Sequence, residues 1–229
     1  IAGQMVDHWT PDPNDPNFGK QYKYEAQPNN VKDYFQQGLE LATNLQVTMN
    51  TKNSNTVFSY TNTEARGIVE SNNLHGHNLN LRYGTTFKEK LVLDSKITMI
   101  KQQFENTFST GEGFNNPMRY LYVLPRTIRS ADLQKFEYKN AAGQVRQHYY
   151  RWNDNGTGNP YWTRKRVLQP RDIWRTIGMF SLKYNITKDL SIMGRSAIDN
   201  TFNLYQLKYY NDTYTQAING GYTKENNSS

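Results

Sequence analysis

Cysteine is absent from the 229 residues of this chain, and histidine occurs only 4 times. Without cysteine the chain has no disulfide framework, no thiolate zinc site and no cysteine nucleophile. Long apolar runs are also missing. Apolar residues make up 36% of the sequence, mean hydropathy is -0.89, and no run approaches the roughly 18 residues of a membrane-spanning helix. Low mean hydropathy does not exclude a transmembrane β-barrel, because apolar and polar residues alternate along the strands of such barrels.

Motifs of catalysis are missing as well. The sequence contains no Gly-x-Ser-x-Gly, no His-Glu-x-x-His and no phosphate-binding loop, so we expect no enzyme and no cofactor. His75 and His77 share one face of a predicted strand, as two metal ligands do, but no third ligand is identifiable nearby and we predict no metal site. We also expect no signal peptide in the opening residues, since Ile1 leads directly into Gln4, Asp7 and His8.

Aromatic residues and asparagine are abundant. Aromatics make up 14% of the chain, with 17 tyrosines, and asparagine recurs in pairs such as Asn72-Asn73 and Asn115-Asn116. Tyrosine favours strands and interfaces, whereas asparagine favours turns and loops over helix interiors. This composition predicts an all-β protein whose strands are joined by long polar loops.

Apolar and polar residues alternate with a period of two in three predicted antiparallel hairpins, at about 39–61, 75–100 and 173–199. We predict that the apolar set faces lipid: Leu79, Leu81, Leu91, Leu93, Ile97, Phe180, Leu182, Leu190 and Ile192. The polar set would face the lumen of a barrel or its plug: Asn80, Arg82, Asp94, Lys96, Thr98, Arg195 and Asp199. Tyr83 and Tyr184 are predicted at the periplasmic interface of the bilayer.

The predicted connections are unequal in length. Turns inside the hairpins take about five residues, whereas residues 1–38, 101–172 and 200–229 are predicted as loops. Short turns on one side and long extracellular loops on the other are typical of an up-and-down outer-membrane barrel, and strands of about ten residues match its span. A soluble β-sandwich that binds carbohydrate has the same period of two and remains the alternative.

The loop at 101–172 holds most of the net charge. It carries 12 Lys+Arg and 6 Asp+Glu, a difference of +6 within a chain total of +7. Basic residues are interleaved with aromatics, but no nucleic-acid motif is present and we predict no nucleic-acid partner. The predicted ligand-binding cluster is Tyr149, Tyr150, Arg151, Trp152, Asn153 and Asp154. The competing interpretation is that these aromatics pack the loop on itself, as we also expect for Asn159-Pro160-Tyr161-Trp162.

Several segments, in order, resemble the SusC/RagA-type TonB-dependent outer-membrane transporters. The resemblance covers about residues 3–205 and is specific in the order and spacing of its segments. They are Phe58-Ser-Tyr-Thr, Gly67-Ile-Val-Glu-Ser-Asn-Asn-Leu, Asn78-Leu-Asn-Leu-Arg, Lys88-Glu-Lys-Leu, Ile97-Thr-Met-Ile, Leu121-Tyr-Val-Leu-Pro-Arg-Thr-Ile-Arg, Asn159-Pro-Tyr-Trp and the stretch from Arg175 to Arg195.

The resemblance implies a part of a large barrel in the bacterial outer membrane. Members of that family import oligosaccharides or oligopeptides through a 22-stranded barrel with an N-terminal plug. The chain resembles only the central part of such a barrel, so we expect residues 1–229 to be a fragment without a plug domain. The implied partners are outer-membrane lipid, the remainder of the barrel and plug, a SusD-like lipoprotein lid, TonB through the missing N-terminal part, and a glycan or peptide cargo.

Overall fold

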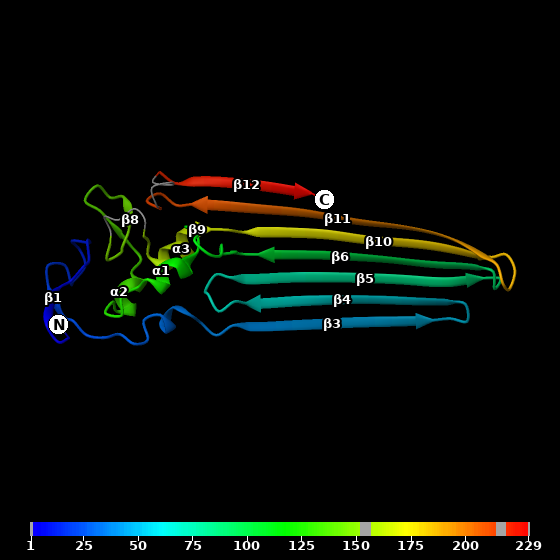
Figure 1. Cartoon of the computed structure of the whole chain (residues 1–229), viewed down its shortest axis with the longest axis horizontal. Coiled ribbons are helices and arrows are strands. Elements are labelled where there is room, and N and C mark those ends of the chain that lie inside the picture. The colour runs from blue at the N-terminus through cyan, green and yellow to red at the C-terminus, as the bar shows by residue number, and fades with distance from the viewer. Residues whose placement is uncertain (1, 152–156, 214–218, 229) are drawn as a thin grey trace.

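One large antiparallel sheet dominates the computed structural model, which describes residues 2–151, 157–213 and 219–228. Its strands follow the order β12-β11-β10-β6-β5-β4-β3, with every neighbouring pair antiparallel (Figure 1). Six of these strands are long: β3 (Leu39–Asn50), β4 (Ser54–Arg66), β5 (Asn73–Phe87), β6 (Leu91–Phe104), β10 (Arg171–Asn185) and β11 (Ser191–Tyr209). The predicted antiparallel hairpins are confirmed, and each is longer than expected.

Three short turns close the hairpins at one end of the sheet, on the right of Figure 1. Between β5 and β6, Lys88 and Glu89 have φ angles of 47° and 60°. Two successive residues with positive φ match the right-handed twist of the flanking strands, which is why such turns are favoured in hairpins. In the first turn, Thr51 N donates to the carbonyl of Ser54 at 2.8 Å.

The predicted loop at 200–229 is wrong in part. Strand β11 continues to Tyr209, where its last eight residues pair with β12 (Gly221–Ser228). The short strand β9 (Val167–Leu168) also pairs with the end of β11. Polar residues such as Asn203 and Gln206 interrupt the apolar alternation, so the sequence pattern did not predict this extension. The hydrogen bonds of a sheet are made by backbone groups, so a strand tolerates polar side chains on an exposed face.

The long connections fold together at the other end of the sheet (Figure 1). We call residues 2–38, 67–72, 105–151 and 157–170 the connection unit. Its elements are β1 (Met5–Asp7), β2 (Gln21–Lys23), the 3-10 helix η1 (Lys32–Tyr34), α1 (Pro117–Tyr122), α2 (Ser130–Gln134), β7 (Glu137–Lys139), β8 (Val145–Gln147) and α3 (Pro160–Arg166). The prediction of loop for 1–38 and 101–172 therefore missed three short α-helices and, with β9, five short strands. No helix among the described residues is long and apolar enough to cross a membrane.

Asparagine and proline start two of these helices. Asn116 and Asn159 are N-caps whose side chains accept hydrogen bonds from the backbone N–H groups of Met118 and Tyr161, at 3.0 and 2.8 Å. A proline occupies the first position of each helix, where its missing N–H costs nothing. The asparagine-rich composition that predicts loops therefore also serves to begin helices.

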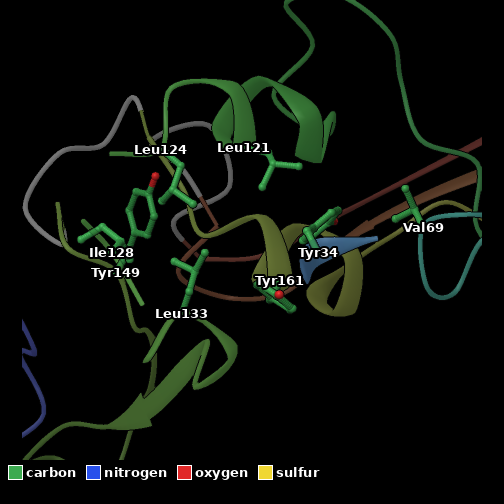
Figure 2. Packing of buried hydrophobic residues seen from close by; sticks show 8 residues of the cluster. All are labelled: Tyr34, Val69, Leu121, Leu124, Ile128, Leu133, Tyr149 and Tyr161. Atoms are coloured by element: carbon green, nitrogen blue, oxygen red, sulfur yellow. The ribbon is translucent and has the colours of Figure 1, made fainter. Parts of the chain in front are cut away.

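The buried core lies in the connection unit. Figure 2 shows its main cluster, which is formed by side chains from η1, the β4–β5 connection, the three helices and the loops beside them. The cluster consists of Tyr34, Val69, Leu121, Leu124, Ile128, Leu133, Tyr149 and Tyr161. None of these residues comes from the six long strands. A second, smaller cluster of Tyr120 and Val167 packs against Leu207 and Tyr209 of β11, so the hydrophobic effect also holds the unit to the end of the sheet.

Candidate functional site

The register of the long strands places most of their large apolar residues on one face, which we call the apolar face. A row across the sheet contains Val47, Phe58, Leu81, Ile97, Gly178 and Ile198. Large apolar side chains here remain open, with Leu45 59% exposed and Ile198 64% exposed. The predicted lipid-facing residues share this face, except that Leu190 lies in the turn just before β11. An exposed apolar face of this extent marks an interaction surface.

Aromatic residues border the apolar face at both ends. Tyr83, Phe87 and Tyr184 lie toward the short turns, whereas Tyr60, Trp174 and Phe202 lie toward the connection unit. Lys101 is the cross-strand neighbour of Trp174, and its Nζ lies 4.7 Å from the centre of the indole ring. Aromatic side chains with a polar partner on one side suit the boundary between an apolar phase and water.

The opposite face, which we call the polar face, carries ion pairs and amides. Arg82 donates two hydrogen bonds to Asp94, at 3.1 and 3.0 Å, and Arg175 pairs with Asp199 in the same two-pronged way. Thr98 Oγ1 donates to Asn80 at 2.6 Å. All the residues predicted to face the lumen lie on this face. These ion pairs and amides thus lie on the side of the sheet opposite the apolar row.

Charged groups within the connection unit hold α3 to the segment that joins β4 and β5. Glu70, in the connection between β4 and β5, accepts hydrogen bonds from Arg164 and Lys165 of α3. The guanidinium of Arg164 lies beside two rings, 5.1 Å from the centre of Tyr34 and 4.5 Å from that of Tyr161. The hydrogen bond from Lys165 and the charge of Arg164 hold the pKa of Glu70 below its ordinary value against partial burial. This arrangement anchors α3 over the end of the sheet.

A hollow of about 600 Å³ opens on the connection unit beside α1. Its lining is Gly111, Glu112, Asn116, Arg119, Tyr120, Tyr122, Val123, Arg151 and Thr157. Arg119 stacks on Phe114, with 4.5 Å between the guanidinium carbon and the ring centre, and donates to the carbonyl of Glu112 at 2.8 Å. The ring of Tyr122 is 75% exposed at the rim. The volume is within the range of small-molecule sites, and its lining combines guanidinium groups with an open aromatic ring.

The structure separates the members of the predicted ligand cluster. Tyr149 is buried in the core, so its ring is not open to a ligand. Tyr150 is half-buried against it, with ring centres 4.5 Å apart, while Arg151 lines the hollow. Trp152, Asn153 and Asp154 lie outside the described residues. The prediction of a ligand contact is thus wrong for Tyr149, which packs in the core as the competing interpretation expects. Arg151 does line a hollow, but the sequence did not indicate the other residues of that hollow.

Sequence patterns missed Glu112, Arg119 and Tyr122 as site residues. They lie 29 to 39 residues before Arg151 and share no motif with it. Only the packing of α1 against α3 and the neighbouring loops brings these stretches together. The one available signal was the run of aromatic and basic residues around α1, which equally fits a helix packed on a core.

The two histidines of β5 have separate partners. His75 Nδ1 contacts Glu64 and its Nε2 lies 3.4 Å from Glu105, whereas His77 Nδ1 lies 2.7 Å from the hydroxyl of Tyr60. Within the part of the chain that the structure describes, no three His, Asp or Glu side chains are arranged to hold a metal ion. The histidines therefore belong to the polar margin of the sheet beside the connection unit.

Comparison with known proteins adds no relative. No protein-family model matches the chain, and no curated protein matches its sequence. The functional argument therefore depends on the two-faced sheet, the connection unit and the hollow.

Proposed function

We propose that this chain forms part of the wall of a bacterial outer-membrane transporter of the SusC/RagA type. In this role the apolar face contacts lipid, the polar face lines the barrel interior, and the connection unit lies outside the cell. The observation that carries the proposal is the exposed apolar face, bordered by aromatic residues at both ends and backed by ion pairs. Membrane barrels have this arrangement, with an apolar outer band and a polar interior.

The unpaired edges of the sheet support a larger barrel. Among the described residues, no strand pairs with the outer edge of β3 or with the outer edge of β11 before Phe202. An open edge in lipid leaves backbone N–H and C=O groups without hydrogen bonds, which costs several kcal/mol per group. The proposal therefore requires the remainder of the barrel as a partner at both edges.

Cargo uptake completes the proposal. Oligosaccharides or oligopeptides would pass along the polar face, with a SusD-like lipoprotein lid over the connection unit and TonB supplying energy from the periplasm. The connection unit supports a binding role because its hollow is open, partly aromatic and positively charged. The chain itself performs no chemistry in this role.

The carbohydrate-binding sandwich is the weaker candidate. A sandwich buries the inner face of one sheet beneath a second sheet of similar size. The other sheets of the described residues have two strands each, β1 with β2 and β7 with β8, and the apolar face remains exposed. A carbohydrate site on the connection unit is compatible with both candidates.

Limited proteolysis of the assembled transporter that contains this chain, reconstituted in lipid vesicles, tests the proposal. Trypsin should cut the connection unit and leave the basic residues within the strands intact, including Arg82, Lys96, Arg175, Lys183 and Arg195, because the bilayer shields the strands that carry them. The control is the same digestion after the vesicles are dissolved in detergent and the protein is unfolded in urea, which should expose every site. A protein that is monodisperse without detergent, unfolds cooperatively in water and ignores vesicles would contradict the proposal.

A further inference from the structure

The basic side chains of the connection unit differ in how firmly they hold a carboxylate. Lys135 pairs with Asp15 at 2.9 Å, and Arg166 makes two hydrogen bonds to Glu137, both at 2.7 Å. Arg164 and Lys165 share Glu70. These pairs join segments distant in sequence and take part in holding the unit together, so their cations are already committed to structural partners.

Arg119 is held differently. Its guanidinium is fixed by stacking on Phe114 and by the hydrogen bond to the carbonyl of Glu112. Its carboxylate partner is the side chain of Glu112, which lies 3.8 Å away and is 96% exposed. An exposed pair at this distance has little net stability. A ligand carboxylate can therefore take the place of Glu112 without unfolding anything, and it would meet a guanidinium already in position.

The rest of the hollow suits a sugar. Tyr122 offers an open ring face at the rim, and Arg151 brings a second guanidinium to the same hollow. Flat apolar faces of sugar rings stack on aromatic rings, while amide, hydroxyl and guanidinium groups bind hydroxyls and carboxylates. An extended peptide usually binds by adding a strand to a sheet edge. None of the nine lining residues lies in a strand, so the hollow offers no such edge.

We propose that the hollow beside α1 binds acidic oligosaccharides, with the carboxylate of a uronic-acid residue displacing Glu112 from Arg119 and a neighbouring sugar ring stacking on Tyr122. The inference deepens the proposed function by naming a cargo class, and it rests on that function for the reason a glycan would reach this surface. No covalent step is involved. Glu112 acts as an exchangeable occupant of the site in the absence of ligand.

Calorimetric titration of the assembled transporter that contains this chain, purified in detergent micelles, tests this inference. The probe is an oligogalacturonide of four residues, and its fully methyl-esterified form is the neutral comparison. Removing the guanidinium with Arg119→Gln should weaken oligogalacturonide binding about tenfold or more, as expected for a charge-assisted hydrogen bond. Glu112→Gln should instead strengthen binding a few-fold, because it removes the competing carboxylate.

Lys139→Gln is the matched control, since it removes one positive charge from β7, outside the hollow. It should leave the affinity within about twofold, because exposed charges at a distance are screened by salt. Glu112→Gln keeps the test valid even if Arg119→Gln disturbs the fold, because the side chain of Glu112 is almost fully in solvent. Weaker or unchanged binding by Glu112→Gln would overturn the displacement mechanism.

Three further results would overturn the inference: equal binding of the esterified and free acids, equal or tighter binding of a tetraglutamate peptide, or no binding of any probe. All three leave the vesicle proteolysis unaffected, so failure of the cargo assignment is distinguishable from failure of the membrane assignment. Binding of the free acid alone, lost in Arg119→Gln and gained in Glu112→Gln, is the expected result.

Discussion

The sheet and the connection unit differ in how far their large apolar side chains are exposed. Large apolar side chains of the sheet remain open to their surroundings, as Leu45 and Ile198 do, whereas Trp162, Leu121 and Leu133 of the connection unit have no exposed surface. Water stabilises the second arrangement and penalises the first. Burial of apolar side chains therefore stabilises the connection unit in water, and under the proposed function the sheet meets an apolar phase.

The ion pairs of the two regions differ in the same sense. On the sheet, Arg82 pairs with Asp94 and Arg175 with Asp199 across neighbouring strands of one face. In the connection unit, ion pairs such as Lys135 with Asp15 join segments far apart in the sequence. The first kind makes a face polar, and the second kind fixes a tertiary arrangement. Variants placed in one region should consequently leave the other unaffected.

The largest expected effect is that of Trp162→Ala in the connection unit. The indole is fully buried, with its N–H donating to Thr213 Oγ1 at 2.8 Å. Its removal should lower the free energy of unfolding of the unit by about 3–5 kcal/mol. Urea unfolding followed by near-ultraviolet circular dichroism measures the change.

The exposed Tyr122 is the matched control, since Tyr122→Ala should change the same free energy by about 0.5 kcal/mol or less. Trypsin protection of the strands in vesicles should survive in both variants. Loss of that protection in Trp162→Ala would show that the two regions are not independent.

A charge placed on the apolar face should have the next largest effect. Ile198→Arg should destabilise the membrane-inserted protein by about 2–4 kcal/mol, as a guanidinium near the bilayer midplane does. Its neighbour Ala197 points to the polar face, so Ala197→Arg should cost much less. Urea unfolding from vesicles compares the two. Equal costs would mean that the two faces meet the same solvent.

Glu70→Gln tests how α3 is anchored to the segment between β4 and β5. The substitution removes the carboxylate that Arg164 and Lys165 share, and because Glu70 is partly exposed we expect a loss of about 1 kcal/mol. Since the folded state lowers the pKa of Glu70, this stabilisation is present above its ordinary pKa and is lost as the pH falls.

Hydrogen exchange should reveal the loss as faster exchange of α3 amides, because Glu70 anchors that helix. Glu25→Gln, which breaks only an exposed pair with Lys23, should leave those amides unchanged. Unchanged α3 exchange in Glu70→Gln would remove the proposed anchor.

The smallest effect is a pH dependence caused by His148. Burial lowers the pKa of this imidazole, partly offset by the charge of Asp15. Between the lowered pKa and the ordinary value of about 6.5, the unfolded chain binds more protons than the folded one, so stability falls as the pH falls. In His148→Gln this slope below about pH 6.5 should be shallower, as measured by urea unfolding at several pH values. An unchanged slope would assign the acid sensitivity to other groups.

Much of the sheet could be predicted from the sequence, and little of the connection unit could. Period-two alternation assigned Leu81 and Arg82 to opposite faces because side-chain direction in a strand is fixed by geometry. The short helices have no such period. Tyr149 and Arg151 stand two residues apart, yet one is buried and the other lines a hollow, and only tertiary packing decides which.

The absence of cysteine makes the most direct test simple, since single cysteines can be introduced along β10 without background labelling. Spin labels at consecutive positions from 173 to 184, in protein reconstituted into bilayers, should alternate in accessibility. Labels at Trp174, Phe180 and Leu182 should be open to oxygen dissolved in lipid, and labels at Arg175, Ser181 and Lys183 to a water-soluble relaxation agent. Uniform accessibility to the water-soluble agent along the strand would contradict the claim that the apolar face lies against lipid.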